Sequence, residues 1–194
     1  MELTTGRLVL RRWRESDRAP LAAMTADPAV MRYFLHGRTP AQSDAWMDRV
    51  EGHFAREGFG IWAVEAPGVA PLIGFTGLAR VIDLPCAPAV EIAWTFAAAY
   101  WRQGYAREAA AAALEDGFNR LDLHQIVAFT ARVNLASQNL MQRLLMVRDP
   151  AADFDHPRIL QGHPLRPHVL YRAWRPAGPR PPRQGAPPTE GSMP

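Results

Sequence analysis

The segment from residue 89 to residue 131 constrains the fold most strongly, because its pattern changes from strand to helix and back to strand. Apolar residues predict a strand over Ala89–Phe96, and an alanine-rich stretch predicts a helix over Arg107–Asn119. A second strand is predicted over Ile126–Ala131. Two strands joined by a crossover helix form a parallel pair, so we expect a parallel pair within the sheet.

Elements on either side of this segment are predicted to complete the sheet. The patterns of residues 61–65 and 72–80 predict a hairpin, and His168–Trp174 predicts a last strand. Amphipathic spacing predicts helices over Gln42–Arg56 and Ser137–Met146. Antiparallel strands that lead into a crossover unit predict a mixed α/β sheet with helices on its faces.

The N-terminal segment is predicted to be another strand. Leu8 and Leu10 alternate with Arg7 and Arg11. This alternation is typical of a half-buried strand, with the arginines on the side opposite the leucines.

The length of 194 residues suits one domain, which we place at residues 1–175. Residues 176–194 are rich in proline and poor in apolar side chains, which predicts a disordered tail. The single cysteine excludes an internal disulfide framework and a four-cysteine zinc site, and we expect no metal. All 22 basic residues are arginine, so neither a lysine Schiff base nor a lysine base is available.

The net charge and the hydropathy of the chain bear on whether it binds nucleic acid or a membrane. A net charge of +3 is too small to indicate nucleic-acid binding. No apolar run reaches the roughly 20 residues of a membrane helix, and the N-terminus lacks the pattern of a signal peptide. We therefore expect a cytoplasmic protein with neither a nucleic-acid partner nor a membrane partner.

The loop Trp101–Ala106 separates the strand 89–96 from the helix that follows it. Backbone N–H groups at a helix N-terminus lack partners within the helix, and together with the helix dipole they bind phosphate oxygens. Gly104 permits a positive φ and a close approach of the backbone. The loop therefore has the features of a phosphate site, although a plain helix-start turn is the more common explanation of such a loop when it is taken alone.

The stretches Val90–Trp94 and Tyr100–Ala109 resemble the signature of the GNAT N-acetyltransferase superfamily. More narrowly, they resemble the branch that includes ribosomal-protein N-terminal acetyltransferases. The resemblance covers about residues 4–175 and implies the GNAT fold, a mostly antiparallel mixed sheet that splays at a central parallel strand pair. Four further segments resemble the same branch in the same order: Thr5–Arg11, Gly60–Leu78, Asn134–Asn139 and His168–Tyr171.

The resemblance also implies that acetyl-CoA binds as a co-substrate between the two parallel strands. Its pantetheine arm is expected along the backbone of three consecutive strand residues and its pyrophosphate at the loop, with an asparagine near the reactive end. The implied cofactor-binding residues are Trp94, Thr95, Phe96, Trp101, Arg102, Gln103, Gly104, Tyr105, Ala106 and Asn134.

Acetyl transfer to an amine requires a base, stabilisation of the carbonyl oxygen and an acid for the departing thiolate. Glu91, on a strand with apolar neighbours, is predicted to be the base, and its alternative is a carboxylate paired with an arginine. The resemblance implies that Ser137 protonates the thiolate, since Met141 stands where many relatives have tyrosine. The alternatives are an ordinary first-turn serine for Ser137 and a helix N-cap for the cofactor contact Asn134.

The branch usually has a glycine where this chain has Leu145, at the end of the predicted helix. Leucine enters the left-handed region only at a cost, so a different helix end is expected.

The acceptor amine is expected to lie opposite the thioester, between two loops that combine aromatic and acidic groups. The candidate contacts are Tyr33, Phe34 and His36 in one loop and Asp155 and His156 in the other. His156 is alternatively a structural hydrogen-bonding residue. The expected function is acetyl transfer to a protein N-terminal amine or a small-molecule amine, by a monomer or homodimer, and the alternative is a non-catalytic acyl-CoA-binding or regulatory module.

Overall fold

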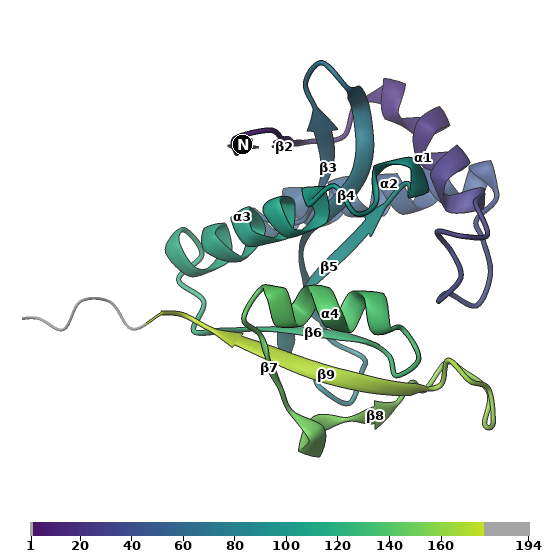
Figure 1. Ribbon diagram of the computed structural model, residues 1–194, viewed down its shortest axis with the longest axis vertical. Helices are drawn as coiled ribbons and strands as arrows, with labels where there is room; N and C mark the ends of the chain where they lie inside the picture. Colours follow the sequence, from purple (N-terminus) through teal and green to yellow (C-terminus); the bar gives the residue numbers. More distant parts are fainter. Residues whose placement is uncertain (1, 177–194) are drawn as a thin grey trace, which may run out of the picture.

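The computed structural model describes residues 2–176, and Figure 1 shows its helices arranged around one sheet. Apart from Pro176, the predicted tail lies outside the described residues. No helix of the described part is long and apolar enough to cross a membrane. The helices are η1 (Glu15–Asp17), α1 (Arg18–Ala26), α2 (Pro40–Glu57), η2 (Ala98–Tyr100), α3 (Tyr105–Asn119), α4 (Leu135–Arg143) and η3 (Pro150–Ala152). The strands are β1 (Leu3–Thr4), β2 (Val9–Arg11), β3 (Ile61–Ala66), β4 (Ala70–Val81), β5 (Ala89–Phe96), β6 (Gln125–Ala131), β7 (Val147–Arg148), β8 (Phe154–Asp155) and β9 (Pro167–Trp174).

The sheet runs in the order β1-β2-β3-β4-β5-β6-β9-β7, with β8 paired to β9. Every pairing is antiparallel except that of β5 with β6. The β4–β5 ladder extends from Gly74 opposite Phe96 to Val81 opposite Ala89. By contrast, β5 and β6 share one register pair and then diverge (Figure 1). The predicted mixed sheet, splayed at a central parallel pair, is confirmed.

The helices cover opposite faces of this sheet. Trp46 of α2 packs against Phe75 of β4, with ring centroids 4.6 Å apart. Leu78 lies three residues further along β4 and therefore on the other face. That face is covered by α3, because a Cβ on Gly117 would lie 2.8 Å from a methyl group of Leu78. Glycine at this position lets α3 approach the sheet closely.

The predicted elements are all present, and most of them have shifted ends. Helix α3 begins at Tyr105, two residues earlier than predicted, and α4 ends at Arg143 instead of Met146. The two-residue strands β1 and β8 were not predicted, because two residues carry no periodicity.

Arg11 is a correction to the predicted N-terminal strand. Its side chain is 1% exposed, so it does not lie on a solvent face. It forms a two-pronged ion pair with the equally buried Asp17, and its Nε donates to Glu65 at 2.6 Å. The carbonyls of Pro71 and Arg12 accept its remaining N–H groups. A buried guanidinium is tolerated here because its donors all have acceptors.

The end of α4 is a second correction. Leu145 adopts the left-handed conformation, with φ +60°. A different helix end was predicted from the sequence, because this conformation is costly for leucine. The N–H of Leu145 donates to Gln142, and the N–H of Met146 donates to Met141. This is a Schellman motif, and burial of both Met141 and Met146 supplies its usual apolar contact. The helix therefore ends as it would with glycine, and the leucine side chain remains 87% exposed.

We expect Leu145→Gly to raise the free energy of unfolding by about 1 kcal/mol, because it relieves left-handed strain and removes almost no buried surface. Urea denaturation measures the change. Leu160→Gly is the control, since Leu160 is similarly exposed without a positive φ. A Leu145→Gly protein no more stable than the parent chain would show that this residue carries no strain.

Candidate active site

The loop after β5 exposes a set of backbone donors at the start of α3. Gly104, with φ +84°, is the residue before the helix, and Arg102 also has a positive φ, +61°. The backbone N–H groups of residues 102–107 donate no hydrogen bond to any residue in the described part of the chain. Unpaired donors at a helix N-terminus bind anions. The predicted positive φ at Gly104 is confirmed, and the loop fits a pyrophosphate, whose binding stays a prediction.

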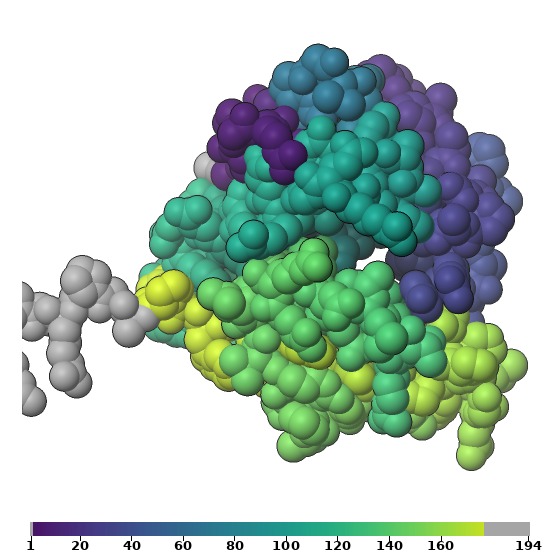
Figure 2. All heavy atoms as spheres, viewed as in Figure 1, coloured from purple at the N-terminus to yellow at the C-terminus, as the bar shows by residue number. Residues whose placement is uncertain are grey.

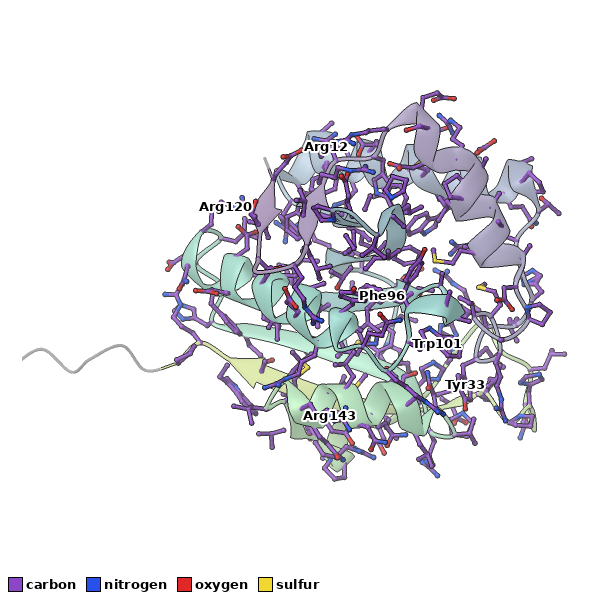
Figure 3. The ribbon with its side chains drawn as sticks, turned by 45° about the horizontal axis from the view of Figure 1, so that its top comes forward. Arg12, Tyr33, Phe96, Trp101, Arg120 and Arg143 are labelled. Atoms are coloured by element: carbon purple, nitrogen blue, oxygen red, sulfur yellow. The ribbon has the colours of Figure 1, made fainter. Side chains whose placement is uncertain are left out.

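Two side chains anchor this loop to the segment before it. The indole N–H of Trp101 donates to the carbonyl of Phe96, the last residue of β5, at 2.7 Å. The amide of Gln103 donates to the carbonyl of Ala99 at 3.0 Å. Figure 3 shows Trp101 close to Phe96. Both side chains therefore hold the loop in shape.

Arg7 also holds the loop, and sequence reasoning did not identify it. Its guanidinium pairs with Glu108 in the first turn of α3, with 2.7 Å between Nη2 and Oε2. Its Nη1 donates to the carbonyl of Gln103 at 3.1 Å, and its guanidinium lies 4.7 Å from the ring centroid of Tyr105. The strand-like alternation gave no sign of these contacts, because Arg7 lies in the turn between β1 and β2.

Glu108 is the only acidic residue in the first turn of α3. Burial raises the pKa of its carboxyl, but hydrogen bonds from Thr5 and Arg7 outweigh burial and lower this pKa. Glu108 is therefore ionised near neutral pH. Because Arg7 compensates this charge, an anion can approach the loop without facing an unpaired carboxylate.

Glu91 lies where β5 and β6 begin to separate, opposite Val127 of β6 and Ala79 of β4. Because its neighbour Ile92 pairs with Leu78 on the α3 face, Glu91 points to the α2 face. Burial raises the pKa of its carboxyl to about 7. Within residues 2–176 it has neither an ion pair nor a side-chain hydrogen bond, which removes the alternative of an arginine-paired carboxylate.

Asn134 is the N-cap of α4, which confirms the structural reading of this residue. Its Oδ1 accepts the N–H of Ser137 at 3.2 Å, and its amide donates to Thr130 at 3.0 Å. Ser137 is half-buried, and its hydroxyl has no hydrogen bond to the described residues. The cap fixes the start of α4 at the carboxyl end of β6, and the cofactor contact of Asn134 stays a prediction.

The end of β5 offers backbone groups to the gap beside it. The N–H of Ala97 donates to Ile73 of β4, and successive strand residues direct their polar groups to opposite sides. Trp94 and Phe96 therefore direct theirs toward β6, whereas Thr95 directs its own toward β4. Since Phe96 already accepts Trp101, Trp94 keeps the freest backbone groups on this edge.

The first predicted acceptor loop borders an opening. Figure 2 shows this opening between the teal segment after β5, the green α4 and the indigo loop between α1 and α2. Tyr33, labelled in Figure 3, belongs to that loop and is half-buried. Phe34 and His36 are exposed. The loop that holds these three residues borders the opening, and their contact with an acceptor stays a prediction.

The second predicted acceptor loop is held by its own contacts. Asp155 pairs with Arg166 at 3.1 Å, and the backbone N–H of Arg158 donates to the ring of His156. The His156 ring lies 5.0 Å from that of His168, and burial followed by this neighbour lowers the pKa of His156. His156 thus makes a structural hydrogen bond, as its alternative stated, and the acceptor contacts of Asp155 and His156 stay predictions. No group of three metal-ligating side chains occurs in residues 2–176.

The geometry agrees with what known proteins show. An acetyltransferase (GNAT) domain model matches residues 7–147. An uncharacterized N-acetyltransferase of Bacillus subtilis (strain 168) is 31% identical over 77% of this chain and 84% of its own length. An acetyltransferase structure from Bacillus anthracis has a TM-score of 0.74 at 24% identity, covering 90% of this chain and 99% of that one.

A third protein was solved with a ligand. The structure of a ribosomal L7/L12 alpha-N-protein acetyltransferase in complex with coenzyme A has a TM-score of 0.70 at 16% identity and covers 90% of this chain and 98% of that one. At this identity the likeness concerns the fold. The family match and the Bacillus subtilis relative go further, and with the splayed strands and the donor-lined loop they show that the chain belongs to the GNAT acetyltransferase family.

Proposed function

We propose that the protein transfers an acetyl group from acetyl-CoA to a primary amine, either a protein N-terminal amine or a small-molecule amine. The observation that carries the proposal is the Glu91 carboxyl, which has no ion pair with the described residues 2–176, has a pKa raised to about 7 and lies at the point where β5 and β6 part. A carboxyl in that range accepts a proton at neutral pH more readily than an ordinary glutamate does.

Each part of the site has a task in this proposal. The N–H groups of the loop 102–106 bind the pyrophosphate, and the edge of β5 at Trp94 positions the pantetheine arm. Acetyl-CoA supplies an activated thioester when it is bound. Glu91 takes the proton of the attacking amine, directly or through water. Ser137 gives a proton to the departing thiolate, whose ordinary pKa is about 8.5.

An amine screen tests the proposal. Purified protein is incubated with acetyl-CoA and N-terminal peptides, polyamines, aminoglycosides or amino acids, and free CoA is measured with a thiol reagent. We expect CoA release with at least one class and an acetylated product by mass spectrometry. Binding of acetyl-CoA without CoA release from any amine would favour the alternative, a non-catalytic acyl-CoA-binding module.

Ser137→Ala is expected to lower kcat by about tenfold, because the thiolate then leaves without an acid, while the KM for acetyl-CoA stays within about twofold. Steady-state kinetics separate the two constants. The matched change Ser43→Ala alters a hydroxyl that is buried between α1 and α2 and bonds Thr25. A Ser137→Ala protein with the parent kcat would exclude the acid role.

Arg7→Gln is expected to raise the Kd for acetyl-CoA about tenfold, because Glu108 then faces the pyrophosphate with less compensation. Removing that charge as well, in Arg7→Gln/Glu108→Gln, should restore part of the affinity. Isothermal titration measures both. Arg56→Gln, on the exposed end of α2, controls for net charge. Equal affinities of the parent and Arg7→Gln proteins would show that Arg7 does not support the loop.

A further inference from the structure

Two arginines on the α2 side of the sheet lack counter-ions. Arg38, in the loop before α2, and Arg49, within α2, form no ion pair with any described residue. The Nη1 of Arg38 is buried and has no hydrogen-bond partner in the described part of the chain. A buried donor without an acceptor is costly and uncommon, so this atom requires an explanation.

The acidic residues of helix α2 do not supply the missing acceptor, because each of them pairs with another arginine. Asp44 and Asp48 both pair with Arg18, at 3.6 and 2.9 Å. The two remaining acids of α2, Glu51 and Glu57, pair with Arg12 and Arg80. Helix α2 therefore has its acidic side chains compensated and presents Arg49 uncompensated.

The two arginines belong to one local environment. The guanidinium of Arg38 lies over the ring of Trp46, 4.8 Å from its centroid. Burial, and secondly the charge of Arg49, lower the pKa of Arg38, and no carboxylate opposes this shift. The arrangement concentrates positive charge around Trp46, which is unfavourable unless an anion joins it.

A cavity lies beside this charge. It has a volume of about 160 Å³, and Trp46, Arg49 and Ala79 are among its lining residues. That volume is close to that of cavities that hold one benzene-sized group. Ala79 is the β4 partner of Glu91, and both point to the α2 face. The cavity is therefore one strand away from the proposed base, on the face of the sheet to which Glu91 points.

We propose that the acceptor is an amine that also carries a carboxylate or a similar anionic group, bound by Arg38 and Arg49, with an apolar portion in the cavity beside Trp46. This inference rests on the proposed function and names its substrate class. Such an anion would accept from the unpartnered donor of Arg38, and a guanidinium binds a carboxylate with paired hydrogen bonds.

A matched pair of substrates tests the proposal. 4-(Aminomethyl)benzoate and 4-(aminomethyl)benzamide present similar amines on the same ring and differ in charge. A tetrapeptide pair with glutamate or glutamine at its second position extends the test to protein N-termini. We expect kcat/KM to favour the anionic member of at least one pair by about tenfold, and the pair that responds distinguishes a small acceptor from a peptide.

Arginine variants test which residues cause the preference for the anionic substrate. Arg38→Gln and Arg49→Gln should each reduce it to about twofold or less, while the KM for acetyl-CoA changes less than twofold, which separates acceptor binding from cofactor binding. Arg56→Gln, on the same helix and exposed, should keep the preference. If Arg38→Gln fails to fold, the exposed Arg49 alone carries the test.

The outcomes distinguish this inference from the function on which it rests. Equal kcat/KM for both members of each pair, or a preference that survives both arginine variants, would overturn the anionic acceptor and leave acetyl transfer intact. If no amine is acetylated, the proposed function fails, and calorimetric titration of the benzoate and the benzamide into the CoA-bound protein then decides the arginine site. Tighter binding of the benzoate supports it, and equal binding rejects it.

Discussion

Gly104→Val should raise the Kd for acetyl-CoA by about 100-fold, equal to the loss of two charge-assisted hydrogen bonds of about 1.5 kcal/mol each. A β-branched residue does not adopt φ +84° without strain, so the turn would move and carry the N–H groups of residues 102–106 with it. A Cβ at this position would also lie 3.2 Å from Nη2 of Arg7, which holds the loop from the other side. Isothermal titration or the KM for acetyl-CoA measures the loss.

The control for this prediction is Gly68→Val in the hairpin between β3 and β4. Gly68 has a similar φ, +78°, and nothing lies near its missing Cβ. Both variants introduce backbone strain, but only Gly104→Val should bind acetyl-CoA more weakly. Similar affinities in the two variants would show that the loop does not bind the pyrophosphate.

Glu91→Gln should lower kcat/KM by about 100-fold at pH 8, the usual contribution of a general base. The pKa of Glu91 is raised to about 7, so the parent activity should increase through that pH as the carboxyl ionises. The amide cannot ionise, so the variant should lose this increase, and its deficit should shrink toward pH 6. Glu115→Gln, on an exposed turn of α3, is the control. A parallel pH profile for both proteins would remove Glu91 from the mechanism.

The same variant should be more stable than the parent chain at high pH. In the unfolded chain Glu91 ionises with its ordinary pKa of 4.5, whereas in the folded chain burial raises this pKa to about 7. The cost of ionising it in the folded state therefore grows between these pH values and is complete above pH 7. We expect Glu91→Gln to gain about 3 kcal/mol at pH 8 and nothing at pH 4, as measured by urea denaturation. A gain that does not depend on pH would point to packing instead of charge.

The sequence predicted the fold well wherever the pattern was long. Strand β5 has the predicted bounds, and the glycine-led turn before α3 was identified. Arg11 was misplaced because periodicity reports which face a residue occupies, and it carries no information about a distant carboxylate that makes burial of a cation possible. Leu145 was misjudged because an intrinsic penalty of about 1–2 kcal/mol is small beside the burial of Met141 and Met146 around it.

The site was predicted less completely, for a related reason. Glu91 was predicted to be the base because a carboxylate between apolar strand neighbours is conspicuous in sequence, and its catalytic role stays a prediction. Arg7 escaped notice because its partner Glu108 is far away along the chain and belongs to another element. Arg38 and Arg49 form no ion pair within residues 2–176 because the acids of α2 pair with other arginines, and the sequence does not show which arginine each acid contacts.

The single register pair between β5 and β6 has a mechanical consequence. The sheet therefore consists of two parts, β1–β5 and β6–β9, which are joined only by the short pairing of β5 with β6. A co-substrate bound in the gap would contact both parts of the sheet and hold them together. At a concentration 100 times its Kd it would stabilise the folded state by about 2.7 kcal/mol. We expect amide hydrogen exchange to slow in both parts of the sheet when acetyl-CoA is added. The rigidity of the whole domain would then depend on the concentration of acetyl-CoA.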